Sequence, residues 1–255
     1  MNDSQSPSSP MHPARSPSIT ALVPMRHDSE RVRGKNFRPL AGRPLYHHVV
    51  RALLACQHID EIVIDTDSPT ITEDCAQSFG GSAGPRVRVI PRPEHLRDGH
   101  IPMNEVLRHD TTQAGTGKPD DLFLQTHSTN PFLQTETITA AIEAFLAHRD
   151  QHDSLFGVTR WQTRLYDQHG SPINHNPTEL LRTQDLPPVF EENSNLYLFT
   201  RAVIEATGRR MGERPRLFEI DRLEATDIDD EEGWRLAEAL VLTGQLGQPA
   251  AAPAD

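Results

Sequence analysis

The feature that most constrains the fold of this 255-residue chain is the alternation of short apolar segments with longer amphipathic ones. The short segments have the length of buried strands, and the longer ones run for roughly ten or more residues with the spacing of a helix that buries one face. Such alternation predicts βαβ units around a mainly parallel sheet with helices on both faces, a three-layer α/β/α fold. We expect strands at 19–24, 61–65, 87–91, 122–125, 154–158 and 195–199, and helices at 44–56, 69–79, 102–113, 136–148 and 231–242.

The alternating pattern occupies residues 19–243, which we expect to form one domain between two tails. Residues 1–18 are rich in Ser and Pro and residues 244–255 carry little to bury, so both are expected to be disordered. Residues 160–192 interrupt the pattern with a polar stretch rich in His, Asn and Pro. A segment of this length inside a compact domain is usually functional or reaches a partner subunit, so we expect a protruding arm.

Composition excludes several classes of protein. The formal net charge of -11 argues against coating of nucleic acids and against binding to anionic membranes. No apolar run approaches the roughly 20 residues of a membrane span, and the first residues lack a charged-then-apolar signal pattern. The two cysteines, Cys56 and Cys75, are too few for a disulfide framework or a structural zinc site. We therefore expect a cytoplasmic protein with no nucleic-acid or membrane partner.

The segment after the first expected strand concentrates positive charge. It leaves the carboxyl end of that strand, where parallel sheets bind ligands. Residues 26–43 hold six basic side chains against two acidic ones, a net charge of +4. Such a reversal of sign suits a polyphosphate. Lys35, which follows Gly34, is one of only two lysines, so its compact ammonium suggests a phosphate contact. A solvated basic loop is the alternative, and the spacing does not match a Walker A loop.

This segment carries a family resemblance. PMRHDSERVRGKN at 24–36, continued by RPLAGRPL at 38–45, resembles the N-terminal signature of the acylneuraminate cytidylyltransferases, the CMP-sialic acid synthetases. In that family the loop wraps the triphosphate of CTP. The resemblance therefore implies that Arg26 and Lys35 hold phosphates and that Asn36 lies near the cytidine. The residues of this loop implied to bind nucleotide are Arg26, Ser29, Lys35 and Asn36.

Two further segments bear on the nucleotide. RPEHL at 92–96 resembles the family's R-P-x-x-L, which implies that Arg92 lies near the nucleotide. Asn104 stands where the family has small hydroxyl residues, so it is a further expected nucleotide ligand. The turn DTDS at 65–68 also has a family counterpart, but its acids and Ser68 equally suit a helix cap, which we favour.

The expected sugar site combines two other matches. LQTHSTNPF at 124–132 resembles the family's L-Q-P-T-S-P-L, and the segment from 182 to 197 resembles R-x-Q-x-L-P-x-x-[FY]-x-x-N-G-x-x-Y. The guanidinium of Arg182 suits the carboxylate of a sugar acid because its planar fork binds bidentately. His127 is expected to form hydrogen bonds, with metal ligation or general-base chemistry as alternatives. The implied sugar-binding residues are Gln125, His127, Arg182, Gln184 and Asn193.

An acidic run near the end of the chain completes the pattern. TDIDDEEGW at 226–234 resembles the family's D-I-D-T-x-x-D, and alternation places Asp227 and Asp229 on one side of an extended segment. Two such carboxylates suit Mg²⁺, which prefers oxygen ligands and shares its shell with substrate phosphates. The alternative is a helix N-terminus, where acids complement the dipole. The order of the other matches favours the metal. The expected catalytic residues are Arg26, Lys35, Asp227 and Asp229.

The resemblance spans residues 19–243 and implies a Rossmann-like nucleotidyltransferase fold in which 160–192 forms a dimerisation arm. It implies a homodimeric, Mg²⁺-dependent enzyme that transfers CMP from CTP to the anomeric hydroxyl of a sialic-acid-like 2-keto sugar acid, releasing pyrophosphate. The product would serve cell-surface polysaccharide biosynthesis. Sialic, legionaminic, pseudaminic and Kdo-type acids are all open as the sugar.

Two other functions compete with this one. A glycosyltransferase-like sugar-nucleotide enzyme is one, because Asp-x-Asp metal motifs also occur there. A non-catalytic nucleotide-binding descendant is the other, because the chain departs from the family at Asp28, Glu30, Met103 and Glu191. If the chain binds triphosphate, Asp28 and Glu30 should point away from it or contact a metal.

Overall fold

The structure is a computed structural model that describes residues 17–29, 31–80 and 86–243. Apart from residues 17 and 18, the two tails expected at 1–18 and 244–255 lie outside the described residues, as does Glu30.

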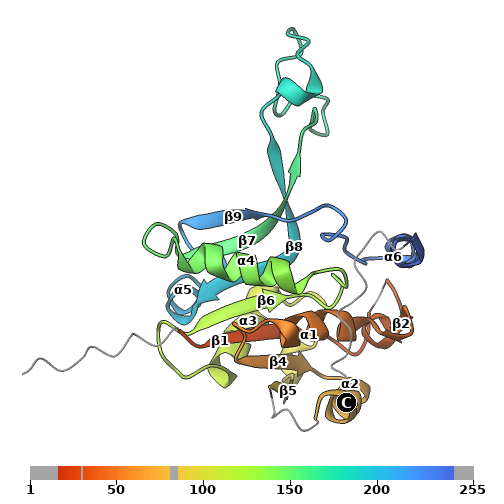
Figure 1. Cartoon of the computed structure of the whole chain (residues 1–255), viewed down its shortest axis with the longest axis vertical. Helices are drawn as coiled ribbons and strands as arrows, with labels where there is room; N and C mark the ends of the chain where they lie inside the picture. Colours follow the sequence, from red (N-terminus) through yellow and green to blue (C-terminus); the bar gives the residue numbers. More distant parts are fainter. Residues whose placement is uncertain (1–16, 30, 81–85, 244–255) are drawn as a thin grey trace, which may run out of the picture.

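A seven-stranded sheet forms the centre of the molecule, with strand order β5-β4-β1-β6-β8-β7-β9 (Figure 1). Strands β5, β4, β1 and β6 are parallel, β8 runs antiparallel to both β6 and β7, and β9 pairs in parallel with β7. The prediction of a mainly parallel sheet is confirmed. The strands are β1 (Ile19–Pro24), β4 (Glu61–Thr66), β5 (Val87–Pro91), β6 (Leu122–Thr126), β7 (Ser154–Trp161), β8 (Val189–Thr200) and β9 (Pro215–Glu219).

Helices cover both faces of this sheet, which confirms the three layers. Because side chains alternate along a strand, Val23 of β1 joins the core with α1, α2 and α4, whereas its neighbour Leu22 joins the core with α3 and α5. The helices are α1 (Leu45–Ala55), α2 (Pro69–Phe79), α3 (Met103–Gln113), α4 (Thr135–Leu146), α5 (Arg201–Thr207) and α6 (Glu231–Thr243). None of the helices in the described part of the chain has the length and apolarity that a bilayer crossing needs. Both cysteines are buried and free.

Every strand and helix expected from the pattern is present, with ends that shift by a few residues except at β8, which begins six residues before its expected start at 195. The sequence pattern missed α5, β9 and the two-residue strands β2 (Pro39–Leu40) and β3 (Arg43–Pro44). Helix α5 has only seven residues and follows β8 directly, so no turn marks its start. Strand β9 lies at the edge of the sheet and leaves most of its side chains partly exposed, which gives it no continuous apolar run.

Helix α6 packs against the beginning of the chain. Its Trp234 and the preceding Ile228 are buried in a small core with Val32 of the loop after β1 and with Leu40. Leu40 belongs to a short hairpin of β2 (Pro39–Leu40) and β3 (Arg43–Pro44). The guanidinium of Arg38 lies 4.1 Å from the centre of the Trp234 ring. This packing holds the acidic segment before α6 against the basic loop.

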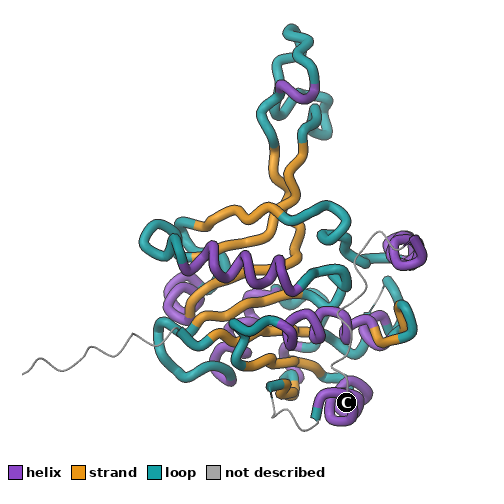
Figure 2. Tube along the Cα trace, viewed as in Figure 1, coloured by secondary structure: helices purple, strands orange, loops and turns teal. Residues whose placement is uncertain are grey.

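The segment expected to form an arm does protrude. Strands β7 and β8 continue past the sheet as a twisted pair, from the Arg160–Phe190 and Trp161–Val189 partners outward, and carry residues 162–188 away from the body (Figures 1 and 2). The pairing shifts by a bulge between Phe156 and Val158. Gly157 lies within it, and a Cβ atom there would come 2.7 Å from Ile220 Cδ1 and 2.8 Å from Asn193 Oδ1, so a larger residue would displace both side chains.

Candidate functional site

The basic loop occupies the carboxyl end of β1, as expected. Gly34 has a φ of 63°, in the left-handed region that favours glycine, and a Cβ atom there would lie 2.9 Å from the Phe37 ring. This turn leads into the 3₁₀ helix Lys35–Phe37 and buries the side chains of Lys35 and Asn36. The position of Lys35 therefore depends on the glycine before it.

Lys35 joins the beginning of the chain to its end. Its Nζ donates a hydrogen bond of 2.8 Å to the carbonyl oxygen of Ile228, 193 residues away, and lies 3.9 Å from Asp229 Oδ1. Burial lowers the pKa of Lys35, while the charges of Asp227 and Asp229 raise it. The basic loop and the acidic segment thus meet at one place.

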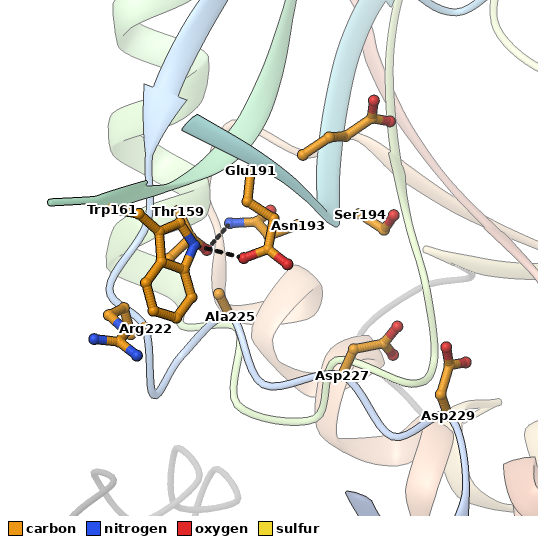
Figure 3. A pocket seen from close by; sticks show the side chains of 10 residues that line it. Thr159, Trp161, Glu191, Asn193, Ser194, Arg222, Ala225, Asp227 and Asp229 are labelled. Carbon is orange, nitrogen blue, oxygen red and sulfur yellow. Dashed lines mark hydrogen bonds between the residues drawn. The ribbon is translucent and has the colours of Figure 1, made fainter. Parts of the chain in front are cut away.

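Asp227 and Asp229 line a cavity of about 380 Å³ together with residues of β7 and β8. In Figure 3 the side chains of Asp227 and Asp229 leave one extended segment on the same side, as the alternation predicted, and their carboxylates turn toward the same space. The opposite wall holds the Trp161 indole, whose Nε1 donates to Glu191 Oε2 at 2.7 Å. The lining residues are Thr159, Trp161, Glu191, Glu192, Asn193, Ser194, Arg222, Ala225, Asp227 and Asp229.

The two carboxylates differ in their surroundings. Burial raises the pKa of Asp227, and the charge of Asp229 raises it further, while a hydrogen bond from Thr129 and the charge of Lys35 lower it. The Oδ1 atom of Asp227 is buried and has no hydrogen-bond partner among the described residues. Asp229 is half exposed and pairs with Arg31 at 3.1 Å.

This donor set fits Mg²⁺ that is shared with a polyphosphate. The described residues contain no group of three or more His, Cys, Asp or Glu side chains arranged around one metal position. One or two carboxylates with substrate phosphates are, however, the usual way in which proteins bind Mg²⁺. The buried Oδ1 of Asp227 would gain a partner from such an ion.

The helix-terminus alternative holds for a neighbouring residue. Asp230 Oδ1 accepts hydrogen bonds from the backbone N–H groups of Glu232 at 3.0 Å and Gly233 at 2.8 Å, so Asp230 stabilises the start of α6. The acidic run therefore divides between a helix cap and the two carboxylates that face the cavity.

Asn36 ties the basic loop to the turn after β6. Its Nδ2 donates to the carbonyl of Arg26 at 2.8 Å, and its Oδ1 accepts from Ser128 Oγ at 2.6 Å. These bonds give Asn36 a structural role, and its expected position near the cytidine stays a prediction. Arg26 and Ser29 are partly exposed in the same loop, and Asp28 is exposed.

Ser68 is the helix cap that we favoured. Its Oγ accepts from the N–H of Ile71 at 3.2 Å, at the start of α2, and also contacts His27 Nδ1 at 2.7 Å. The turn after β4 thus supports the basic loop through its contacts with His27.

Arg92 is placed differently from our expectation. It is buried, and its Nε donates to Asp65 Oδ2 at 3.1 Å, so its charge is balanced inside the protein and not displayed in the cavity. Asp110 lies against this pair, and burial together with the negative charge of Asp65 raises the pKa of Asp110 to about 9. The side chain of Asn104 accepts a hydrogen bond from the backbone N–H of Arg210 at 3.2 Å.

Three of the expected sugar-binding residues lie in the body of the protein. Gln125 is buried, and its Oε1 accepts from Arg210 Nη1 at 2.6 Å. Burial, assisted by the charges of Arg210 and Lys35, lowers the pKa of His127 to about 3, so its imidazole is neutral at physiological pH. Asn193 lines the cavity and donates to Thr159 Oγ1 at 3.2 Å.

Two expected sugar-binding residues lie elsewhere. Arg182 and Gln184 are exposed on the arm, and the Nε of Arg182 donates to Asp185 Oδ2 at 2.7 Å. Because the arm extends away from the body, this chain does not bring them to Gln125 or Asp227 (Figure 1).

Sequence reasoning missed Arg210, which lies between α5 and β9 and is in contact with Gln125. The segment around it has no apolar period and matches no motif that we recognised, so nothing in the local pattern distinguishes Arg210 from the exposed Arg209 beside it.

Comparisons with known proteins identify the family of the chain. The sequence profile of a family described as cytidylyltransferase matches residues 20–247. The chain is 28% identical over 231 residues to N-acylneuraminate cytidylyltransferase A of Danio rerio, covering 88% of this chain but about half (51%) of the relative. It is also 28% identical over 239 residues to the CMP-N,N'-diacetyllegionaminic acid synthase of Legionella pneumophila, covering 89% of this chain and 97% of that one.

Among solved structures, a CMP:2-keto-3-deoxy-manno-octonic acid synthetase complexed with CTP superimposes with a TM-score of 0.64 at 15% sequence identity. The match covers 89% of this chain and 99% of that one. At this identity the likeness concerns the fold, and it agrees with the expected nucleotidyltransferase architecture.

Proposed function

This chain belongs to the cytidylyltransferase family, and we propose that it transfers CMP from CTP to the anomeric hydroxyl of a 2-keto sugar acid, releasing pyrophosphate. The observation that carries the proposal is the meeting of Lys35 with Asp227 and Asp229 beside one cavity. A cation and two carboxylates at the carboxyl edge of a parallel sheet suit a metal–triphosphate complex.

The reaction requires mainly that the sugar hydroxyl be aligned with the α-phosphorus and that the charge of the leaving pyrophosphate be neutralised. The sugar hydroxyl attacks the α-phosphorus while pyrophosphate leaves on the opposite side, and such transfers need little covalent help from the protein. We assign Lys35 and Arg26 to the phosphate oxygens of the leaving group. Lys35 is already oriented by its bond to Ile228, so it loses little conformational freedom when the nucleotide binds.

Asp227 and Asp229 would hold Mg²⁺. When bound, the ion would neutralise phosphate charge and polarise the phosphoryl group under attack. The two residues would differ in their contribution, because Asp227 is mostly buried whereas Asp229 is half exposed and shared with Arg31.

On the sugar side we assign Gln125, His127 and Asn193. A neutral His127 can accept or donate a hydrogen bond without adding a further positive charge beside Lys35. The exposed arm residues Arg182 and Gln184 join this set only if a second chain supplies them.

We therefore also propose a homodimer in which the arm of each protomer reaches the partner's sugar site. The arm exposes large apolar side chains: Leu180 is 91% exposed, Ile173 61% and Tyr166 54%. Apolar groups gathered on a projecting segment favour burial against another protein surface. We place the enzyme in the cytoplasm, where CTP is available, as a supplier of activated sugar for cell-surface polysaccharide biosynthesis.

The experiment is an assay of pyrophosphate release with CTP, Mg²⁺ and a panel of sugar acids, with UTP as the control nucleotide. The panel should contain N-acetylneuraminate, N,N'-diacetyllegionaminate, a pseudaminate and 3-deoxy-manno-octulosonate. We expect CTP-dependent release with at least one acid. Tight binding of CTP without release for any acid would instead favour the non-catalytic descendant.

A further inference from the structure

The cavity beside Lys35 presents an electrostatic problem for an anionic sugar. Four carboxylates line it, those of Glu191, Glu192, Asp227 and Asp229. A sugar acid that enters such a site brings a fifth negative charge, so a positive side chain is needed to receive it.

Two other arginines could serve, but each has a disadvantage within one chain. Arg222 lines the cavity, but it is exposed and its guanidinium stacks 3.8 Å from the centre of the Trp161 ring. Arg182 lies on the arm, is paired with Asp185 and would reach the site only from a second chain. Neither brings a partly buried charge to the neighbourhood of Gln125.

Arg210 does. Its guanidinium carbon lies 3.4 Å from the centre of the Tyr197 ring, and its Nη1 donates to Gln125 Oε1 at 2.6 Å. Its Nη2 is 3.6 Å from Glu192 Oε1, which lines the cavity. The side chain is 15% exposed, and its contacts with β6 and β8 fix its direction.

The charge of Arg210 is only partly balanced. Its one acidic neighbour among the described ion pairs, Glu192, is 41% exposed and also accepts a hydrogen bond from the Tyr197 hydroxyl. A guanidinium has five N–H donors in a planar fork, and the bond to Gln125 uses one of them. Enough donors are left for a bidentate contact with a carboxylate.

The position of Arg210 also suits the way in which the carboxylate is bonded in a 2-keto sugar acid. In a 2-keto sugar acid the carboxylate is attached to the carbon that carries the attacking hydroxyl. Its cation must therefore lie on the side of the α-phosphorus opposite the pyrophosphate that Lys35 is proposed to contact. The charges of Arg210 and Lys35 both act on the imidazole of His127, so the two cations flank one assigned sugar-binding residue.

We propose that Arg210 binds the carboxylate of the sugar acid, with Tyr197 and Gln125 holding the guanidinium in place. This assignment rests on the proposed function and gives it a specific substrate orientation. It transfers to the body of the same chain the role that the sequence suggested for Arg182.

The test compares each acid with its uncharged C1 carboxamide. N-acetylneuraminate and 3-deoxy-manno-octulosonate are assayed with CTP, Mg²⁺ and the wild-type protein, and then with R210M, which keeps an apolar stem but no charge. We expect the wild type to prefer acid over amide by about 10- to 100-fold in kcat/KM, the scale of a charge-assisted contact. In R210M this preference should nearly vanish, with KM for CTP changed much less than KM for the sugar.

Three variants make the result decisive. R209Q, at an exposed arginine paired with Glu213, should keep the wild-type preference. R210K should retain part of it, and E192Q should lower KM for the acid because it removes a competing anion. If R210M does not fold, as judged by its melting temperature, R210K and E192Q still test the assignment.

Several outcomes would overturn it. An unchanged acid-to-amide ratio in R210M or a raised KM for the acid in E192Q would do so, as would loss of the preference in R182Q instead. Absence of pyrophosphate release by the wild type with every acid would contradict the proposed function itself, which is a distinguishable result.

Discussion

The basic loop at the carboxyl end of β1 and the arm carried by β7 and β8 differ in where their contacts come from. The loop finds its partners within the chain: Lys35 bonds to Ile228, Asn36 to Ser128, and Val32 packs with Trp234. The arm holds itself together by short-range contacts, such as that of Arg182 with Asp185, and leaves Leu180 almost fully exposed.

The contrast indicates where one chain is sufficient. The nucleotide end of the proposed site is preorganised, because its lysine, its carboxylates and its supporting amide are fixed before any ligand arrives. The proposed sugar site is incomplete within one chain, because Arg182 and Gln184 lie on the arm and away from the other expected residues. Each prediction below tests one side of this contrast.

The largest effect is expected from Lys35→Ala. Loss of one preorganised charge contact to the leaving group should cost at least about 2–3 kcal/mol of transition-state stabilisation, or roughly 30- to 150-fold in kcat/KM. Pyrophosphate release measures it. The control is Lys118→Ala, which removes the only other lysine, an exposed one, and should leave the rate unchanged. Near-normal turnover of the Lys35 variant would refute its role.

A similar loss, again at least about 2–3 kcal/mol, is expected from Asp227→Ala, because its buried carboxylate is the better placed of the two proposed metal ligands. The matched control is Asp230→Ala, three residues away. Since Asp230 caps α6, its loss should lower the melting temperature while kcat stays close to that of the wild type. Equal activity losses in the two variants would mean that the acidic run acts only through the helix.

The arm should respond to a change that leaves the body intact. Leu180→Asp introduces a charge at a side chain that is 91% exposed, so the melting temperature at low concentration should not change. Sedimentation should nevertheless shift toward monomer, and specific activity should fall on dilution. Leu242→Asp, at an 86% exposed leucine of α6, is the matched control and should do neither. A wild-type monomer at working concentration would contradict the dimer.

The smallest effect concerns Asp110, which lies against the buried pair of Asp65 and Arg92. Because the pKa of Asp110 is raised to about 9, the folded chain keeps a proton that the unfolded chain releases above about pH 4. Stability should therefore fall as pH rises between those values. Asp110→Asn stays neutral, so its melting temperature relative to the wild type should increase from pH 5 to pH 8. A pH-independent difference would contradict the shift.

Most of the fold could be predicted from the sequence because buried strands and amphipathic helices impose their periods on it. The elements that we did not predict were those too short or too exposed to show a period: the seven-residue α5, the edge strand β9 and the two-residue strands β2 and β3. Long-range pairing within the sheet, such as the antiparallel placement of β8 between β6 and β7, is not encoded in a local period.

The candidate site was predictable to the extent that its residues belong to motifs. Lys35, Asp227 and Gln125 lie in recognisable segments, and the structure brings them to one region. Arg92 has a motif but is neutralised by Asp65, a tertiary contact that no spacing reveals. Arg210 has no motif, and only the folding of its segment over Tyr197 places it beside Gln125.

The most direct test of the account is X-ray diffraction, at the manganese absorption edge, from crystals grown with CTP and Mn²⁺ in place of Mg²⁺. We predict an anomalous peak at the carboxylates of Asp227 and Asp229, with the triphosphate within hydrogen-bonding distance of Lys35 Nζ. A metal peak remote from both carboxylates, or CTP bound away from Lys35, would contradict it.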